Sequence, residues 1–229
     1  MSSETWSFFD SGACDPGWNM AADEALLERA SQWPMPVLRV YSWTQPAASF
    51  GYFQHYAEME KVTALRPLVR RPTAGGLVPH DADWTYSLIF PSSHAWYSLR
   101  AEESYRRLHE WIRDSFTQLG VATELSTCCA KELPGQCFAG PEKFDLLRDG
   151  GKIAGAAQRR TRDGLLIQGS IQRQPPSLSR GQWERSLQET ATVAWGTGWG
   201  EFSGAPEWKR CADALHAGRY SQDSFHRKR

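Results

Sequence analysis

The sequence predicts a mixed α+β fold in which helices pack against a mainly antiparallel sheet. Strand-like and helix-like segments follow one another in an irregular order, not as repeated βα units. Tight glycine-containing turns join neighbouring strand-like segments, which favours antiparallel pairing. The 229 residues can bury one substantial core and show no repeat or convincing linker, so we expect a single domain over residues 1–229.

The expected strands are identified by apolar and polar side chains that alternate between turn residues. In the first half of the chain they cover residues 6–12, 37–43, 48–53, 68–71 and 84–90. In the second half they cover residues 144–147, a segment from Lys152 onward, and residues 165–171. Gly51 lies within one of these strands and predicts a close approach by another part of the molecule.

The expected helices have clear start and stop signals. Asp15 followed by Pro16 supplies an N-cap and a proline at the first helical position, and this helix must end before Pro34. The most clearly amphipathic segment carries an apolar stripe and ends at Gly120. This amphipathic segment covers residues 102–119. The other expected helices are a short one at 57–65 and two helices that finish the chain around a Trp- and Gly-rich connection at 194–202.

The composition argues against several classes of partner. Lys and Arg (26) balance Asp and Glu (26), so no global field attracts nucleic acid or an anionic membrane, and we expect the tail at 226–229 to be frayed. The N-terminus lacks a secretory pattern, and no apolar stretch approaches the roughly 20 residues that span a bilayer. The five cysteines form no CxxC pair, so we expect no metal site and a reducing cytoplasm.

The first candidate site is the segment Arg70 to Asp81, which reads RRPTAGGLVPHD. Its two adjacent glycines present backbone N–H groups suited to a phosphate, a carboxylate or a thioester oxygen. Arg70 and Arg71 alternate across a strand, so only one of them is expected to face that seat. His80 and Asp81 also face opposite ways on a strand, which favours a structural role for one of them over an acid–base pair. The alternative for the whole segment is a hairpin loop with a solvated arginine.

The second candidate site combines Cys137 with Lys152. A thiolate attacks carbonyl carbons and a nearby ammonium stabilises it, so the pair is suited to acyl transfer through a thioester. The glycines at 150–151 let the lysine lie deep, and the small residues at 155–157 leave room for an acyl chain. The alternatives are a buried structural cysteine and a solvated lysine at a turn.

Five ordered motifs resemble the lipoate–protein ligase and octanoyltransferase family, which shares its catalytic fold with biotin protein ligase. The motifs are Trp6–Gly12 with Asn19–Leu26, Gly51–Gln54, Arg70–Asp81, Gly151–Gln158 and Gln168–Ile171. The resemblance covers about residues 5 to 175 and implies the α+β catalytic fold of that family. Residues 137–145, CFAGPEKFD, resemble the Cys-Phe-x-x-Pro segment of its cysteine-dependent octanoyltransferases more than the Asn-Asp-Ile segment of its ATP-dependent ligases.

The resemblance also implies roles for particular residues. The cysteine that carries the acyl thioester corresponds to Cys137, and the lysine that lowers its pKa corresponds to Lys152. The residues implied in acyl or adenylate binding are Arg71, Ala74, Gly75, Gly76, Leu77, Val78, His80, Gly155, Ala156 and Ala157. Ala74 stands where the family has glycine, Gly76 where it often has arginine, and Ala156 where it has serine.

The resemblance therefore implies transfer of an octanoyl or lipoyl group from a carrier thioester to a protein lysine, without a cofactor. The donor is expected to be an acyl carrier protein or free octanoate or lipoate, and the acceptor a lipoyl domain or the glycine cleavage carrier protein. Two alternatives stay open. An ATP-dependent lipoate ligase would use ATP and magnesium, with Lys152 on the adenylate and Cys137 incidental. A degenerate, non-catalytic member would only bind acyl groups or lipoyl domains.

Overall fold

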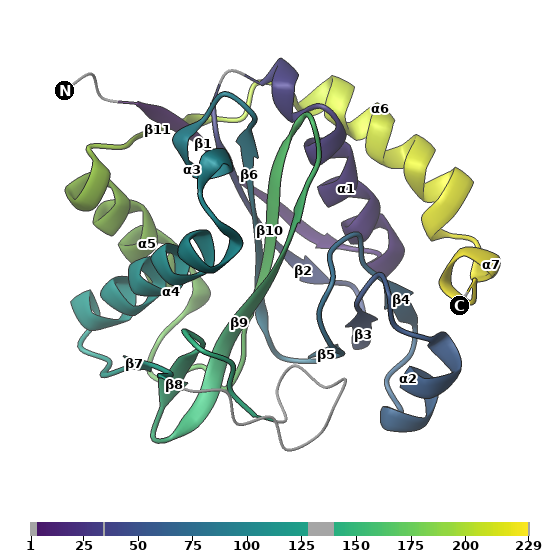
Figure 1. The fold of residues 1–229 in the computed structure, drawn as a ribbon, viewed down its shortest axis with the longest axis horizontal. Helices are drawn as coiled ribbons and strands as arrows, with labels where there is room; N and C mark the ends of the chain where they lie inside the picture. The colour runs from purple at the N-terminus through teal and green to yellow at the C-terminus, as the bar shows by residue number, and fades with distance from the viewer. Residues whose placement is uncertain (1–3, 34, 128–139, 229) are drawn as a thin grey trace.

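An eight-stranded sheet forms the centre of the molecule in the computed structural model, which describes residues 4–33, 35–127 and 140–228 (Figure 1). Its strand order is β11-β1-β2-β6-β10-β9-β8-β7. These strands are β1 (Thr5–Cys14), β2 (Val37–Trp43), β6 (Trp84–Pro91), β7 (Glu124–Leu125), β8 (Leu146–Arg148), β9 (Gly151–Arg160), β10 (Gly164–Ile171) and β11 (Gly198–Glu201). β1 pairs in parallel with β2 and β11, and the other pairings are antiparallel, which confirms the predicted fold class.

Hairpin connections set the register of the strands that carry the second candidate site. β9 pairs with β10 on one side and with β8 on the other. Between β8 and β9, Asp149 and Gly150 both have positive φ, at 51° and 74°. This backbone conformation matches the twist of a two-residue hairpin turn, and Asp-Gly adopts it readily. The turn places Lys152 at the beginning of β9, opposite Leu147.

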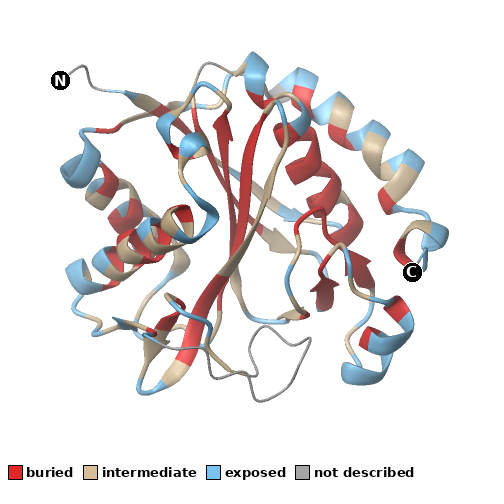
Figure 2. Ribbon diagram, viewed as in Figure 1, coloured by how far each residue is buried: buried red, intermediate tan, exposed pale blue. Residues whose placement is uncertain are grey.

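Helices cover both faces of the large sheet (Figures 1 and 2). On one face Leu108 and Trp183 pack with Leu88, and on the other Leu26 packs with Ile89. Leu88 and Ile89 enter different cores because successive strand side chains point to opposite faces. The α-helices are α1 (Pro16–Glu28), α2 (Tyr56–Val62), α3 (Ala95–Ser98), α4 (Ala101–Gln118), α5 (Arg180–Trp195), α6 (Ala205–Leu215) and α7 (Asp223–His226), with shorter helical turns η1 (Ala30–Gln32) and η2 (His216–Tyr220).

The C-terminal region differs from the sequence expectation in two ways. The connection at 194–202 contains β11, which pairs in parallel with the first strand from Thr5↔Gly198 onward. The tail is not frayed from its first residue, because His226 is buried and its Nδ1 accepts a hydrogen bond from the backbone N–H of Arg70 at 3.0 Å. Both contacts join segments that are far apart in the sequence, so local patterns do not report them.

A smaller sheet, β4-β3-β5, lies beside the large one and packs against α2. Its strands are β3 (Ala47–Phe50), β4 (Leu68–Arg70) and β5 (Val78–His80). Gly51 follows β3 directly, and a Cβ atom there would lie 1.9 Å from the carbonyl oxygen of Gly75. Any side chain at this position would collide with the backbone, so the close approach predicted for Gly51 is confirmed.

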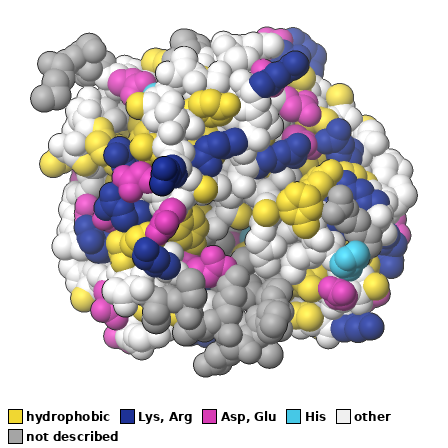
Figure 3. Space-filling model, in the orientation of Figure 1, with side chains coloured by type: hydrophobic (Ala, Val, Ile, Leu, Met, Phe, Trp, Pro, Cys, Tyr) yellow, Lys and Arg dark blue, Asp and Glu magenta, His cyan; other side chains and the backbone are white. Residues whose placement is uncertain are grey.

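The surface carries mixed charge. Lys and Arg side chains are interspersed with Asp and Glu over the face in Figure 3, in agreement with the balanced composition. None of the helices within the described ranges has the length and the apolar character needed to cross a bilayer.

Candidate active site

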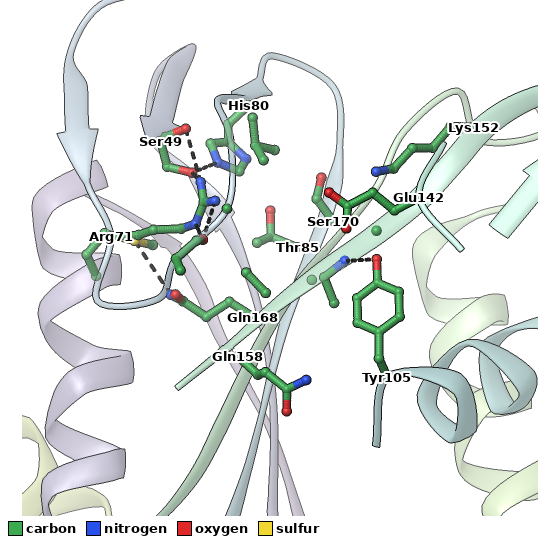
Figure 4. A pocket seen from close by; sticks show the side chains of 18 of the residues that line it. Ser49, Arg71, His80, Thr85, Tyr105, Glu142, Lys152, Gln158, Gln168 and Ser170 are labelled. Atoms are coloured by element: carbon green, nitrogen blue, oxygen red, sulfur yellow. Dashed lines mark hydrogen bonds between the residues drawn. The ribbon is translucent and has the colours of Figure 1, made fainter. Parts of the chain in front are cut away.

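A cavity of about 280 Å³ lies between the two sheets (Figure 4). Nine of the residues that the sequence assigns to the site line it, namely Arg71, Ala74, Gly75, Val78, His80, Lys152, Gly155, Ala156 and Ala157. Gly76 and Leu77 are not among the described lining residues, and Leu77 instead packs into the core under the small sheet. Cys137 lies outside the described residues. The structure thus brings the two candidate segments, 71–80 and 152–157, to opposite sides of one cavity.

Lys152 is held at the cavity wall by a buried ion pair. Its Nζ lies 2.7 Å from Oδ2 of Asp145, and the two side chains are 6% and 0% exposed. Asp145 also accepts hydrogen bonds from the backbone N–H of Glu142 (2.6 Å) and from the hydroxyl of Tyr105. A Cβ atom on Gly155 would lie 2.7 Å from Cε of Lys152. The absence of a side chain at this glycine therefore makes room for the lysine itself.

The groups around this ion pair are strongly desolvated. Burial, followed by the charge of Asp145, raises the pKa of Tyr105 well above its ordinary value, so its hydroxyl stays protonated. Burial also lowers the pKa of His109 to about 4, so this imidazole is neutral at pH 7. Its Nδ1 lies 3.0 Å from the carbonyl oxygen of Tyr105. Among the described residues, Lys152, its partner Asp145 and Glu142 are the ionisable side chains with ordinarily charged forms on this side of the cavity.

On the opposite wall, Arg71 faces the cavity and Arg70 faces away, as strand alternation predicts. Nη2 of Arg71 donates a hydrogen bond to the carbonyl oxygen of Ala74 at 2.6 Å, which braces the glycine-rich turn. Nη1 of Arg70 donates to the carbonyl oxygen of Tyr52 at 2.6 Å, outside the cavity. Arg71 is thus the arginine that contributes positive charge to the site.

The glycine-rich turn accommodates the alanine at position 74. Gly75 has a φ of 94°, a conformation that favours glycine. Ala74 is not among the described residues with positive φ. The backbone conformation that demands a glycine is therefore met by Gly75, and alanine fits at the position before it.

The histidine of the first segment is paired with a residue other than its neighbour. Nδ1 of His80 lies 2.8 Å from Oδ2 of Asp83, and Asp81 is exposed. On its other side, Nε2 of His80 lies 2.8 Å from Oγ of Ser49. His80 thus pairs with Asp83 and Ser49 from its place in the cavity wall, as expected from the opposite directions of His80 and Asp81 on a strand.

The floor of the cavity rests on a buried polar network. Gln168 lines the cavity, and its Nε2 donates to Oδ2 of Asp23 while its Oε1 accepts from Thr73, both at 2.7 Å. Asp23 in turn forms an ion pair with Arg39 at 2.7 Å, with both side chains 0% exposed. This network ties the glycine-rich turn to α1, β2 and β10.

Sequence reasoning missed the residues that hold the site residues in place. They are Ser49, Asp83, Tyr105, Asp145 and Gln168. Asp145 and Gln168 carried a signal, because Asp145 belongs to the 137–145 segment that marks the sub-type of the family and Gln168 begins one of the family motifs. Asp83 lies three residues beyond His80, but nothing in the local pattern indicates that the chain turns back there.

Solved structures with the same fold are lipoate–protein ligases. A lipoate–protein ligase A bound with ATP superimposes with a TM-score of 0.79, at 19% identity over 98% of both chains. A bi-partite lipoate protein ligase of Thermoplasma acidophilum gives a TM-score of 0.73, at 18% identity over 98% of this chain and 96% of the other. These similarities establish the catalytic fold of a lipoate–protein ligase.

Sequence comparison then assigns the family. Residues 15–175 match the model of the lipoyl protein ligase A/B catalytic domain, and the chain belongs to this family. The octanoyltransferase LipM of Geobacillus kaustophilus is 37% identical over 184 residues, which is 75% of this chain and 66% of the relative. LipM of Bacillus subtilis is 38% identical over the same shares. The match thus spans slightly less than two thirds of these relatives' length.

Proposed function

We propose that this protein is an acyltransferase that moves an octanoyl or lipoyl group from a carrier thioester to a lysine of a lipoyl domain, through a Cys137 acyl-enzyme. The relatives named octanoyltransferase support the octanoyl group. The observation that best supports a role for Cys137 is the position of Glu142, because this residue lines the cavity together with Lys152. It stands five residues after Cys137 in the sequence, and five residues of fully extended chain span at most about 18 Å between Cα atoms.

Cys137 and the residues that line the cavity have distinct roles in this proposed reaction. The Cys137 thiolate attacks the acyl carbon, and the bond to the carrier sulfur breaks. Lys152 stabilises the thiolate and the negative charge of the tetrahedral intermediate. Asp145 orients that ammonium through their 2.7 Å contact. The acceptor amine then attacks the enzyme thioester, an amide forms and the thiol is regenerated, while residues 155–157 face the acyl chain.

Incubation with octanoyl-acyl carrier protein tests the acyl-enzyme. We expect a mass increase of one octanoyl group on the peptide that contains Cys137, and release of that group by hydroxylamine at neutral pH, which is typical of a thioester. Addition of an apo lipoyl domain or of the glycine cleavage carrier protein then discharges the adduct. Transfer to the acceptor that persists undiminished in Cys137→Ala contradicts the proposal.

An ATP-dependent lipoate ligase is the second candidate. Arg71 and Lys152 line the same cavity, and two cationic side chains suit an anionic acyl-adenylate. In this case the turn at Gly75 and Arg71 would hold phosphate, and Lys152 the carboxylate. Within the described ranges no three His, Cys, Asp or Glu side chains gather around a metal position, so magnesium would be bound together with the ATP phosphates.

The donor requirement separates these candidates. With one apo acceptor, an acyltransferase uses the acyl-carrier thioester without ATP, whereas a ligase uses free lipoate plus ATP and is unaffected by Cys137→Ser. Binding of the acceptor without turnover on either donor would indicate the non-catalytic member. Measured turnover on either donor excludes it.

A further inference from the structure

Ser49, His80 and Asp83 form a continuous hydrogen-bonded row beside the cavity. Oγ of Ser49 lies 2.8 Å from Nε2 of His80, and Nδ1 of the same ring lies 2.8 Å from Oδ2 of Asp83. Ser49 is 2% exposed, and the side chains of His80 and Asp83 are 4% and 1% exposed. These are the two contacts that define a Ser-His-Asp triad, which is recognised by geometry and not by chain order.

The hydrogen-bond pattern sets the direction of proton transfer along this row. Oδ2 of Asp83 also accepts from the hydroxyls of Thr85 (2.8 Å) and Ser170 (2.7 Å). Three donors converge on this oxygen, an arrangement that favours the ionised carboxylate. An ionised carboxylate only accepts, so Nδ1–H of His80 donates to it. In the neutral imidazole Nε2 then accepts the proton of Ser49.

Neighbouring groups fix the imidazole and supply charge beside the hydroxyl. The ring of Trp43 stacks on His80 with 3.9 Å between centroids, and its Nε1 donates to the hydroxyl of Thr85 at 2.8 Å. Nη1 of Arg71 lies 3.4 Å from Oγ of Ser49. A guanidinium at this position stabilises negative charge that develops next to the serine. Ser49, Arg71 and His80 all line the cavity, and Figure 4 shows them grouped on one side of it.

We propose that Ser49, His80 and Asp83 form a second acyl-transfer centre, which hydrolyses medium-chain acyl thioesters independently of Cys137. Oγ of Ser49 bonds to the acyl carbon, the carbon–sulfur bond breaks, and the serine proton passes through Nε2 of His80 to the leaving thiolate. Water then attacks the serine ester and gives a proton to His80. The carboxylic acid leaves, and Ser49 recovers its proton from the imidazole. This activity stands on described residues alone and is separate from transfer to a lipoyl domain.

Hydrolysis of S-octanoyl-N-acetylcysteamine by the full chain tests the proposal, with thiol release as the readout. We expect hydrolysis to persist in Cys137→Ala and to fall by about 100-fold or more when Ser49→Ala is added. Ser186→Ala is the matched control, because Ser186 is as buried as Ser49 but donates to the carbonyl oxygen of Ser115 and is not among the residues that line the cavity. The hydrolysis rate with this control substitution should stay within about tenfold of the rate of Cys137→Ala alone. No hydrolysis in Cys137→Ala, or equal rates with and without Ser49, overturns the proposal.

A second measurement needs no variant. A fluorophosphonate probe should label the unmodified protein on the peptide that contains Ser49, because only an activated serine reacts with it. Labelling of another serine, or of none, overturns the proposal. The outcome is independent of the Cys137 experiment: failure of serine labelling leaves transfer to the lipoyl domain intact, and failure of the cysteine adduct leaves serine labelling intact.

Discussion

Two buried ion pairs flank the cavity and differ in what surrounds them. Arg39–Asp23 and Lys152–Asp145 both have a 2.7 Å contact. Both side chains of the first pair are 0% exposed, and neither lines the cavity. Lys152 of the second pair does line it. Burial is nearly equal in the two pairs, so burial alone does not indicate which pair takes part in the proposed reaction.

The hydrogen bonds of the first pair explain its structural role. Arg39 also donates to Ser11 Oγ (2.9 Å) and to Asn19 Oδ1 (2.6 Å). Asp23 also accepts hydrogen bonds from the hydroxyl of Tyr41 at 3.0 Å, and from the side chains of Ser87 and Gln168, both at 2.7 Å. These partners come from β1, β2, α1, β6 and β10. The pair thus connects the elements behind the cavity, whereas the Lys152 pair presents its cation to the cavity.

Breaking the first pair should have the largest effect on stability. Asp23→Leu leaves the Arg39 charge buried without its carboxylate, and we expect a loss of about 3–5 kcal/mol in the free energy of unfolding. Urea denaturation measures it. The double variant Arg39→Met/Asp23→Leu should recover part of the loss, since apolar replacement of a whole buried pair is often tolerated. A loss below about 1 kcal/mol in Asp23→Leu would show that the network does not hold the fold together.

Breaking the second pair should instead remove activity. Lys152→Met should slow single-turnover transfer to a lipoyl domain by about 100- to 1,000-fold, because a charged donor to the reacting groups is lost. Lys152→Met also leaves the Asp145 carboxylate buried without its cation, although Asp145 keeps its hydrogen bonds from Tyr105 and Glu142. Urea denaturation therefore accompanies the assay, and rates are compared where the variant is folded. Lys143→Met is the matched control, because Lys143 pairs with Glu102 at the surface and should have no effect. Equal transfer rates for the two variants would remove Lys152 from the mechanism.

The sequence could predict the half of each site that depends on local chemistry. The Asp149-Gly150 turn, the close approach at Gly51 and the prediction that only one of Arg70 and Arg71 faces the site all follow from turn residues and strand alternation. The partners of the site residues could not be predicted in the same way. Asp83 reaches His80 only because the chain reverses between β5 and β6, and Tyr105 reaches Asp145 from a helix that packs across the sheet.

The pattern of apolar residues also did not predict β11. Its four residues form a strand only because β1 offers a free edge for parallel pairing. Strand periodicity also gives the wrong burial for Arg39, because a charged residue within an alternating strand indicates a solvent-facing position. Its complete burial is set by Asp23 on α1, which lies 16 residues earlier and is invisible to strand periodicity.

The smallest expected effect is a loss of stability at low pH, which comes from His109 beside the Lys152–Asp145 pair. His109 lies close enough to Asp145 and Lys152 to feel both charges, but burial dominates and lowers its pKa from 6.5 to about 4. Above pH 6.5 the histidine is neutral in the folded and unfolded chains, and its contribution to stability is fully present. As the pH falls from 6.5 towards 4, the unfolded chain binds the proton first, so stability is lost, by at most about 3 kcal/mol.

Urea denaturation of the native protein and of His109→Gln across this range measures the difference. The variant should show the shallower pH dependence because it has no imidazole to protonate, and parallel curves would mean that His109 titrates normally and that this wall of the cavity is hydrated.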